Sequence, residues 1–192
     1  MTTDTKIRCR WAVENPDLIE YHDTVWGVRP TTETRYFEAL GLCILHAGLG
    51  WIMVLRKRPQ LAEVFDGWDP VKIARYDGED MERLMEAPGM IRNFQKVNAI
   101  IHNAEKFLDI QREFGSFDKY LWRFTDGETL ACSASGECTE EDCTNGRREA
   151  ESISVDLKKR GFKFAGPGTA FGLMEDVGLL NHHDENCFRY SE

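Results

Sequence analysis

Apolar side chains recur at helical spacing over the first half of the chain. Residues 33–46 predict one helix, because its small and apolar positions fall on one face: Phe37, Leu40, Gly41 and Ile44. Thr31 and Thr32 precede an acidic residue, which is typical of a helix start. The pattern breaks at 47–50, which reads Ala-Gly-Leu-Gly, and a second helix is expected from near Trp51 to the basic residues 56–58.

Two shorter helices and one long helix follow. Residues 69–76 predict a helix that Asp69 caps and that Pro70 begins, and 79–86 predict another. A tight Pro-Gly turn at 88–89 then precedes a long helix with one apolar face: Val97, Ile100, Ile101, Ala104 and Leu108. A helical hairpin of this kind can present backbone N–H groups to a phosphate. A plain connecting turn is the alternative interpretation.

The last third predicts helices at 116–124, at 152–161 and at 169–180. Between the first two lies a long acidic loop, 125–151, rich in Ser and Gly. No segment alternates convincingly between apolar and polar residues, and no internal repeat is found, so the prediction is an all-α fold.

The composition limits the possible domain number, binding partners and location of the protein. A chain of 192 residues with 42% hydrophobic side chains is expected to form one large domain or two small lobes. The net charge of −9 does not suggest nucleic-acid binding. However, the acidic loop holds eight acids and two arginines and so carries much of this charge. Basic clusters elsewhere in the chain could therefore form a local basic face. No apolar run could span a membrane and no signal peptide is recognised, so a cytoplasmic protein without a membrane partner is expected.

The cysteines and histidines suggest a metal site. Cys9 and His22 lie in an aromatic-rich stretch near one end, and His183 and Cys187 lie four residues apart near the other, where a helical turn would place them on one face. The set suits a tetrahedral zinc ion that would clip the two ends together. Ligands so distant in sequence could equally be unrelated. The acidic loop carries further cysteines, Cys132, Cys138 and Cys143, whose spacing is poor for a zinc knuckle; they are expected to be free thiols, with a loose second site as the alternative.

Six segments together resemble the 3-methyladenine DNA glycosylase I family, which belongs to the helix-hairpin-helix glycosylases: RCRW, YHD-x-x-WG, AGLGWIMVLRKR, GMIRN, LKKRGFKFAG and GLLNHH-x-x-x-C. The resemblance implies one all-α, two-lobed domain over 1–192 with the active site between the lobes. The terminal segments would form one lobe and about 33–120 the helix-hairpin-helix lobe. It also implies one structural Zn2+ on the four ligands named above.

The family resemblance further implies hydrolysis of the N-glycosidic bond of 3-methyladenine in double-stranded DNA, by a monomer that flips the base and has no lyase step. It places four aromatic residues at the base pocket: Trp11, Tyr21, Trp26 and Trp51. Tyr21 and Trp51 are also candidate catalytic residues. Leu49 matches a residue that wedges into the space left by the base. The remaining candidates would hold phosphates: Gly89, Met90, Ile91, Arg92 and Lys96.

One position departs from the family pattern. The family has a Glu followed by Gly-Gln-Gln before the Ala-Gly-Leu turn, whereas Cys43 begins the same stretch here. Cys43 offers a weak donor, or a thiolate if its pKa is lowered, and no general base is then visible. Glu38 is expected to face elsewhere, and Glu20 and Asp23 are the nearest other acids. The enzyme is expected to stay active on the charged lesion; the alternatives are another modified base, a small-molecule substrate, or binding without catalysis.

Some aromatic and histidine residues are expected to have no functional role. Trp68 and Trp122 are predicted to lie in the core. His46 and His182 are predicted to be surface or satisfied core histidines.

Overall fold

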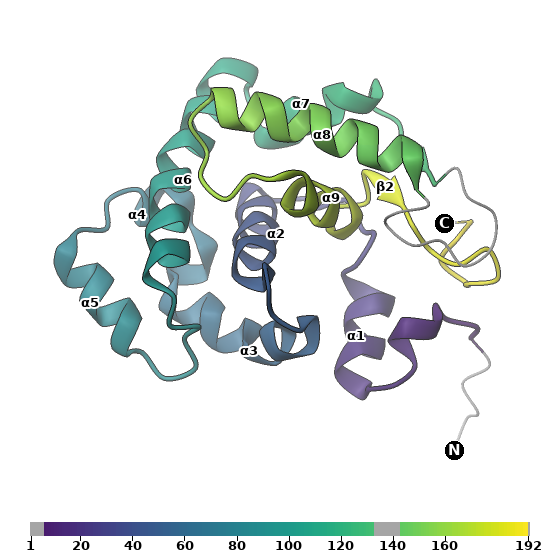
Figure 1. Cartoon of the computed structure of the whole chain (residues 1–192), viewed down its shortest axis with the longest axis horizontal. Helices are drawn as coiled ribbons and strands as arrows, with labels where there is room; N and C mark the ends of the chain where they lie inside the picture. The colour runs from purple at the N-terminus through teal and green to yellow at the C-terminus, as the bar shows by residue number, and fades with distance from the viewer. Residues whose placement is uncertain (1–5, 133–142, 192) are drawn as a thin grey trace.

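A computed structural model describes residues 6–132 and 143–191, and helices dominate it (Figure 1). The α-helices are α1 (Pro16–Thr24), α2 (Glu33–His46), α3 (Trp51–Val64), α4 (Pro70–Ile73), α5 (Gly78–Glu86), α6 (Phe94–Phe114), α7 (Phe117–Trp122), α8 (Thr144–Lys159) and α9 (Pro167–Asp176). Short 3-10 turns are η1 (Arg10–Ala12), η2 (Asp66–Trp68) and η3 (Arg123–Thr125). The prediction was an all-α fold, and a mostly helical fold is confirmed.

Helix α2 runs through the middle of the molecule, between α9, α3 and α6 (Figure 1). Every residue from 36 to 45 is buried, because neighbouring elements cover all sides of the helix. Gly41 permits the closest of these contacts, since a Cβ atom there would lie 2.3 Å from the Trp68 ring. The predicted start is confirmed: the Thr32 hydroxyl accepts a hydrogen bond from the Arg35 N–H at 3.3 Å.

Helices α5 and α6 are joined by a tight turn, as the Pro-Gly pair predicted. Asp77 caps α5 and Asn93 caps α6 through their side chains. Gly89 adopts φ +82°, and a Cβ there would meet Gln60 at 2.9 Å, so only glycine fits the turn. The turn is held from outside, because the Lys57 ammonium donates to the Gly89 carbonyl at 2.9 Å.

Several predictions about the helices were wrong in detail. Helix α8 begins at Thr144 rather than at 152, so the end of the expected acidic loop is helical, while 133–142, including Cys138, lie outside the described residues. Helix α9 ends at Asp176 rather than at 180, because the chain then forms β2 (Leu180–Asn181), which pairs in parallel with β1 (Leu130–Ala131). The segment 183–187 forms turns and not a helical turn.

The N-terminal segment folds against the C-terminal one. Helix α1, which the sequence prediction lacked, begins at Pro16 after the Asn15 cap. The Arg8 guanidinium pairs with Asp23 at 2.8 Å, and the Phe188 N–H donates to the Ile7 carbonyl at 2.8 Å. Helix α1 and β2 accordingly lie on the same side of the molecule (Figure 1). Among the described residues, none of the helices has the length and apolar character of a membrane span.

Candidate active site

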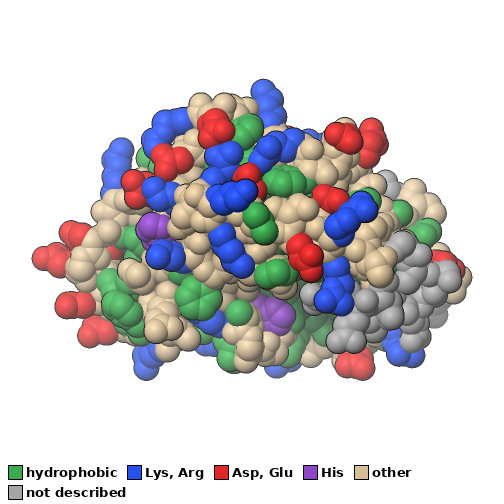
Figure 2. Space-filling model, turned by 45° about the horizontal axis from the view of Figure 1, so that its top comes forward, with side chains coloured by type: hydrophobic (Ala, Val, Ile, Leu, Met, Phe, Trp, Pro, Cys, Tyr) green, Lys and Arg blue, Asp and Glu red, His purple; other side chains and the backbone are tan. Residues whose placement is uncertain are grey.

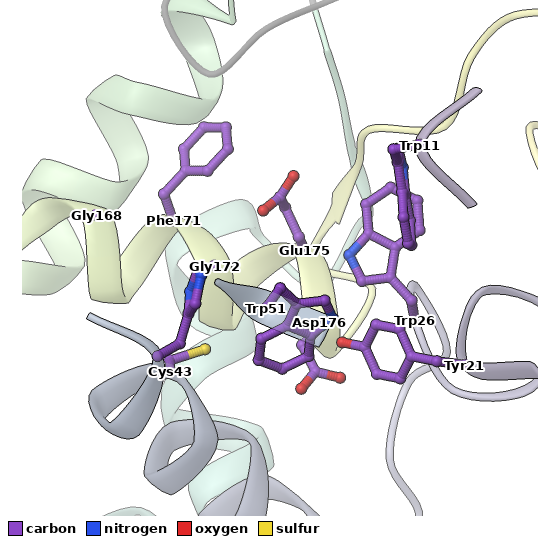
Figure 3. Close-up of a pocket in the computed structure, with 11 residues that line it drawn as sticks. Trp11, Tyr21, Trp26, Cys43, Trp51, Gly168, Phe171, Gly172, Glu175 and Asp176 are labelled. Atoms are coloured by element: carbon purple, nitrogen blue, oxygen red, sulfur yellow. The ribbon is translucent and has the colours of Figure 1, made fainter. Parts of the chain in front are cut away.

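A cavity of about 380 Å³ opens between α1, α2, α3 and α9 (Figure 3). Its lining combines aromatic side chains, a thiol, a histidine, two glycines and two carboxylates: Trp11, Tyr21, Trp26, Cys43, His46, Trp51, Gly168, Phe171, Gly172, Glu175 and Asp176. All four aromatic residues predicted to bind a base therefore line one cavity. Trp68 and Trp122, which were predicted to belong to the core, are both buried in the core and do not line this cavity.

The aromatic side chains form two contacting pairs. Tyr21 from α1 and Trp51 from the first turn of α3 have ring centroids 5.3 Å apart. Trp11 and Trp26 meet edge to face at 4.9 Å. His46, expected to be a surface or core residue, instead lines the cavity with its ring 5.3 Å from Trp51. Burial lowers the pKa of His46, so its imidazole is neutral at pH 7.

Cys43 lies on the α2 side of the cavity and is 8% exposed. Burial raises its pKa well above the ordinary value for a thiol, and the nearby charge of Asp176 raises it further. Cys43 is therefore a neutral thiol, and the alternative of a thiolate does not hold.

Two carboxylates that the sequence analysis missed enter the cavity from α9, Glu175 and Asp176. Asp176 is 2% exposed and forms an ion pair with Arg35 through Oδ1, while its Oδ2 has no hydrogen-bond partner among the described residues. Its charge is a cause, after burial, of the raised pKa of Tyr21. Glu38 does face elsewhere, as expected, since it pairs with Arg58 at 2.7 Å outside the cavity lining.

The loop between α2 and α3 joins two residues of the cavity lining, His46 and Trp51. Leu49 at its tip is 36% exposed. Lys96, expected to hold a phosphate, is instead buried, and its ammonium donates to the carbonyls of Leu45 at 2.7 Å and Ala47 at 2.6 Å. This position satisfies the C-terminal carbonyls of α2 and fixes the loop, so it does not support the predicted phosphate contact. Arg92 is exposed beside the α5–α6 turn, where the side chains of Met90 and Ile91 are buried.

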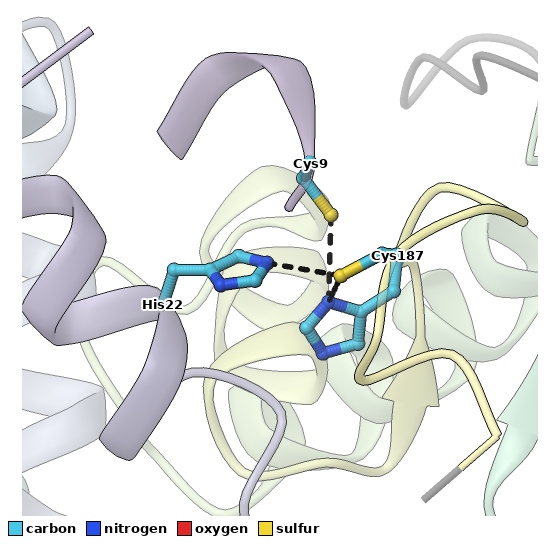
Figure 4. A group of neighbouring side chains, drawn as sticks. Cys9, His22 and Cys187 are labelled. Atoms are coloured by element: carbon cyan, nitrogen blue, oxygen red, sulfur yellow. Dashed lines mark hydrogen bonds between the residues drawn. The ribbon is translucent and has the colours of Figure 1, made fainter. Parts of the chain in front are cut away.

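The four predicted metal ligands converge between η1, α1 and the C-terminal segment (Figure 4). The Cys9 sulfur lies 3.4 Å from His183 Nδ1, and the Cys187 sulfur lies 3.4 Å from His22 Nε2 and 3.6 Å from His183 Nδ1. A sulfur and a nitrogen bound tetrahedrally at about 2.3 and 2.0 Å would lie about 3.5 Å apart. The donor types and their separations thus fit a tetrahedral metal ion. His22 Nδ1 contacts Asp23 at 2.9 Å, as is usual for a metal-binding imidazole.

A second group of potential ligands contains Cys132, Cys143 and His182, with one ligand atom of each within 4.8 Å of the others. The first two were expected to be free thiols and the third a surface or core histidine. The sequence spacing concealed this group, because His182 directly follows β2, the strand that pairs with β1.

Residues 11–190 match the methyladenine glycosylase family. DNA-3-methyladenine glycosylase 1 of Escherichia coli K12 is 37% identical over 95% of this chain and 96% of its own length, and DNA-3-methyladenine glycosylase of Haemophilus influenzae is 33% identical over 94% and 96%. A crystal structure of 3-methyladenine DNA glycosylase I superposes with a TM-score of 0.87 at 36% identity, covering 96% of this chain and 100% of that one. A Staphylococcus aureus structure that concerns 3-methyladenine recognition gives 0.86 at 33%, covering 94% and 95%. The chain belongs to the methyladenine glycosylase family.

Proposed function

We propose that this protein is a monofunctional DNA glycosylase that removes 3-methyladenine from alkylated double-stranded DNA. One observation carries the proposal: the cavity has aromatic walls and two carboxylates, and none of its described lining residues is a lysine or arginine. Such a cavity selects a flat, cationic ring, because the faces of aromatic rings and carboxylates both attract positive charge. An N3-methylated adenine in DNA is a cation of this shape.

The reaction needs little from the protein beyond binding and orientation. The bond between C1′ of deoxyribose and N9 of the base breaks, and its electron pair stays with the base, which leaves as neutral 3-methyladenine. Water supplies the oxygen that bonds to C1′ and releases a proton. Tyr21 and Trp51 would hold the flipped base by stacking. A lyase step would need an amine nucleophile, and the described lining offers none.

Asp176 and Glu175 would supply the negative charge that the family glutamate provides at the position of Cys43. Both enter from α9, whereas Cys43 belongs to α2. Asp176 is close enough to Cys43 for its charge to be a cause of the raised pKa of the thiol. A carboxylate near the bound base favours its cationic form, so the pocket would keep its preference for charged lesions despite the substitution.

DNA would bind across the rim of the cavity. Leu49 would fill the space left by the flipped base, and the backbone N–H groups of the α5–α6 turn, used as a helix-hairpin-helix element, would hold a phosphate with Arg92. Figure 2 shows Lys and Arg side chains mixed with Asp and Glu on the face it displays, so the net charge of −9 does not form one uniform acidic surface. The proposal includes a two-lobed monomer that acts in the cytoplasm.

A structural Zn2+ ion on Cys9, His22, His183 and Cys187 would hold the pocket wall in place. Trp26 lies against this group, with its ring centroid 4.5 Å from that of His183. Trp11 follows Cys9 closely in sequence, so both of these pocket residues depend on the position of the ligands. When bound, the ion would neutralise the two thiolates and cross-link the terminal segments.

Release of 3-methyladenine from methylated duplex DNA tests the function. We expect catalytic release that Trp51→Ala abolishes. The departure at Cys43 favours a second candidate, another modified base or a small N-glycoside, which predicts no 3-methyladenine release but release from a panel of alkylated and oxidised substrates. A binder without catalysis would retain duplexes that contain an abasic analogue and release no base from any substrate.

A further inference from the structure

The two short strands bring a thiol and an imidazole together behind the pocket wall. β1 and β2 pair in parallel with Ala131 opposite Asn181, so the next residues, Cys132 and His182, emerge side by side. The Cys132 N–H extends the pairing by donating to the Asn181 carbonyl at 3.1 Å. This register places the two ligand types together although they are far apart in sequence.

Helix α8 adds a second thiol. Cys143 is the residue before its first turn and is fully buried. The Asn145 amide donates to the Ala131 carbonyl, which ties the helix start to the end of β1. A Cβ atom on Gly146 would lie 2.8 Å from the Cys143 sulfur, so glycine leaves the room that the thiol needs. The N-terminus of a long helix also favours the thiolate form of a cysteine.

The orientation of His182 suits metal binding. Its Nδ1 is engaged by the Glu175 carboxylate, which fixes the ring. Its Nε2 is buried without a hydrogen-bond partner among the described residues, in a side chain that is 9% exposed. A carboxylate on one ring nitrogen and a metal on the other is the usual arrangement of metal-binding histidines.

We propose that Cys132, Cys143 and His182 bind a second divalent metal ion of the zinc class. Two thiolates and one neutral imidazole balance the charge of such an ion and match its preference for sulfur and nitrogen. Three protein ligands leave a fourth position for water or another donor. This site shares no ligand with the Cys9 group and does not depend on the proposed activity.

The position of the site links it to the pocket. Glu175 holds His182 and lines the base cavity, and Phe171 lines the cavity with its ring 5.6 Å from that of His182. A metal ion at His182 would therefore brace the wall that carries a pocket carboxylate.

Metal content of the reduced full-length protein tests this proposal. After equilibration with Zn2+ and removal of free metal, we expect about two ions per chain. Cys143→Ser, Cys132→Ser and His182→Asn should each lose about one of them, and Cys9→Ala should lose the other. Cys43→Ser is the matched control, because this buried cysteine belongs to neither described group, and it should keep both ions. With Cd2+, thiolate-to-metal absorption should fall in Cys132→Ser.

Several outcomes separate the possibilities. The proposal would be overturned if Cys132→Ser and His182→Asn kept the metal content and Cd2+ absorption of the wild type. It would also be overturned if the purified protein held a Cys132–Cys143 disulfide and bound no second ion after that disulfide was reduced. If Cys143→Ser does not fold, the half-exposed Cys132 still provides the test. If only the Cys9 group fails to bind metal, wild type holds about one ion, which Cys9→Ala keeps and Cys132→Ser loses.

Discussion

Asp176 forms an ion pair with Arg35 at the floor of the base cavity while its other carboxylate oxygen has no partner among the described residues. Arg35 also lies 3.5 Å from Glu38, and Glu38 pairs with Arg58, so two acids and two bases form one connected group. One member of this group, Asp176, lines the cavity. Of these four charges, that of Asp176 is therefore the one placed to act on a bound cation.

Asp176→Asn should weaken binding of an N3-methylated adenine that is also alkylated at N9, and so stays cationic as in DNA, by about tenfold or more, because roughly 1.4 kcal/mol of attraction corresponds to tenfold. Binding of neutral adenine should not change. The same variant should lose about 3 kcal/mol of stability, because Arg35 keeps its buried charge with one partner fewer. Calorimetric titration with both bases and urea unfolding measure the two effects.

Glu38→Gln is the control for that experiment. It removes a carboxylate from the same ionic group, but Glu38 does not line the cavity. We expect a similar loss of stability with an unchanged preference for 3-methyladenine over adenine. An equal loss of preference in both variants would show that Asp176 acts only through the stability of the group.

Cys43→Glu should restore the preference that Asp176→Asn removes. In the wild-type background the same change should not improve binding, because two carboxylates in one buried pocket repel each other and one of them becomes protonated. The four proteins form a double-mutant cycle in which affinity for the same N9-alkylated cation is the measurement. Additive effects would contradict a shared role for the two positions.

Release of 3-methyladenine should fall on the acid side at a pH above the ordinary pKa of an aspartate. Burial raises the pKa of Asp176 from 3.8, although Arg35 opposes the shift. As the pH falls through this raised pKa, the carboxylate gains a proton and its attraction for the cation is lost. A pH profile of release, corrected for spontaneous loss of the base, checks this, and Asp176→Asn should lack the same acid limb.

Leu49→Ala should reduce base release from duplex DNA by about tenfold while leaving affinity for free 3-methyladenine unchanged, since a wedge acts only on a stacked duplex. Lys96→Met should have the same signature, because its ammonium fixes the carbonyls of Leu45 and Ala47 beside the wedge. A loss of free-base affinity in Leu49→Ala would contradict its assignment as the wedge.

Arg92→Ala should instead weaken binding to all duplexes and reduce the dependence of duplex affinity on salt concentration.

The sequence predicted the elements that carry strong local signals and missed those set by packing. The predicted caps at Thr32 and Asp69 and the predicted Pro-Gly turn were correct, because side-chain caps and tight turns depend on neighbouring residues. The start of α8 was missed, since Asn145 and Gly146 are weak helix formers and no apolar periodicity precedes Ala150. Two-residue strands such as β1 have no detectable period.

The candidate site shows the same division. The aromatic residues and the Cys9 ligand group were anticipated from motifs. Glu175 and Asp176 were not, because their place in the pocket follows from how α9 packs on α2. Lys96 was assigned to DNA on the family resemblance, whereas its ammonium is buried and satisfied by two carbonyls.

The pairing of the two terminal segments has a consequence for biosynthesis. Trp11 and Tyr21 leave the ribosome before α2 to α9, but two residues that contact their segment, His183 and Cys187, are made after all of these helices. A nascent chain can therefore build its core around α2 before it has a finished base pocket. We expect chains stopped after α9 to be compact yet inactive, so that incomplete translation products cannot excise bases from the genome.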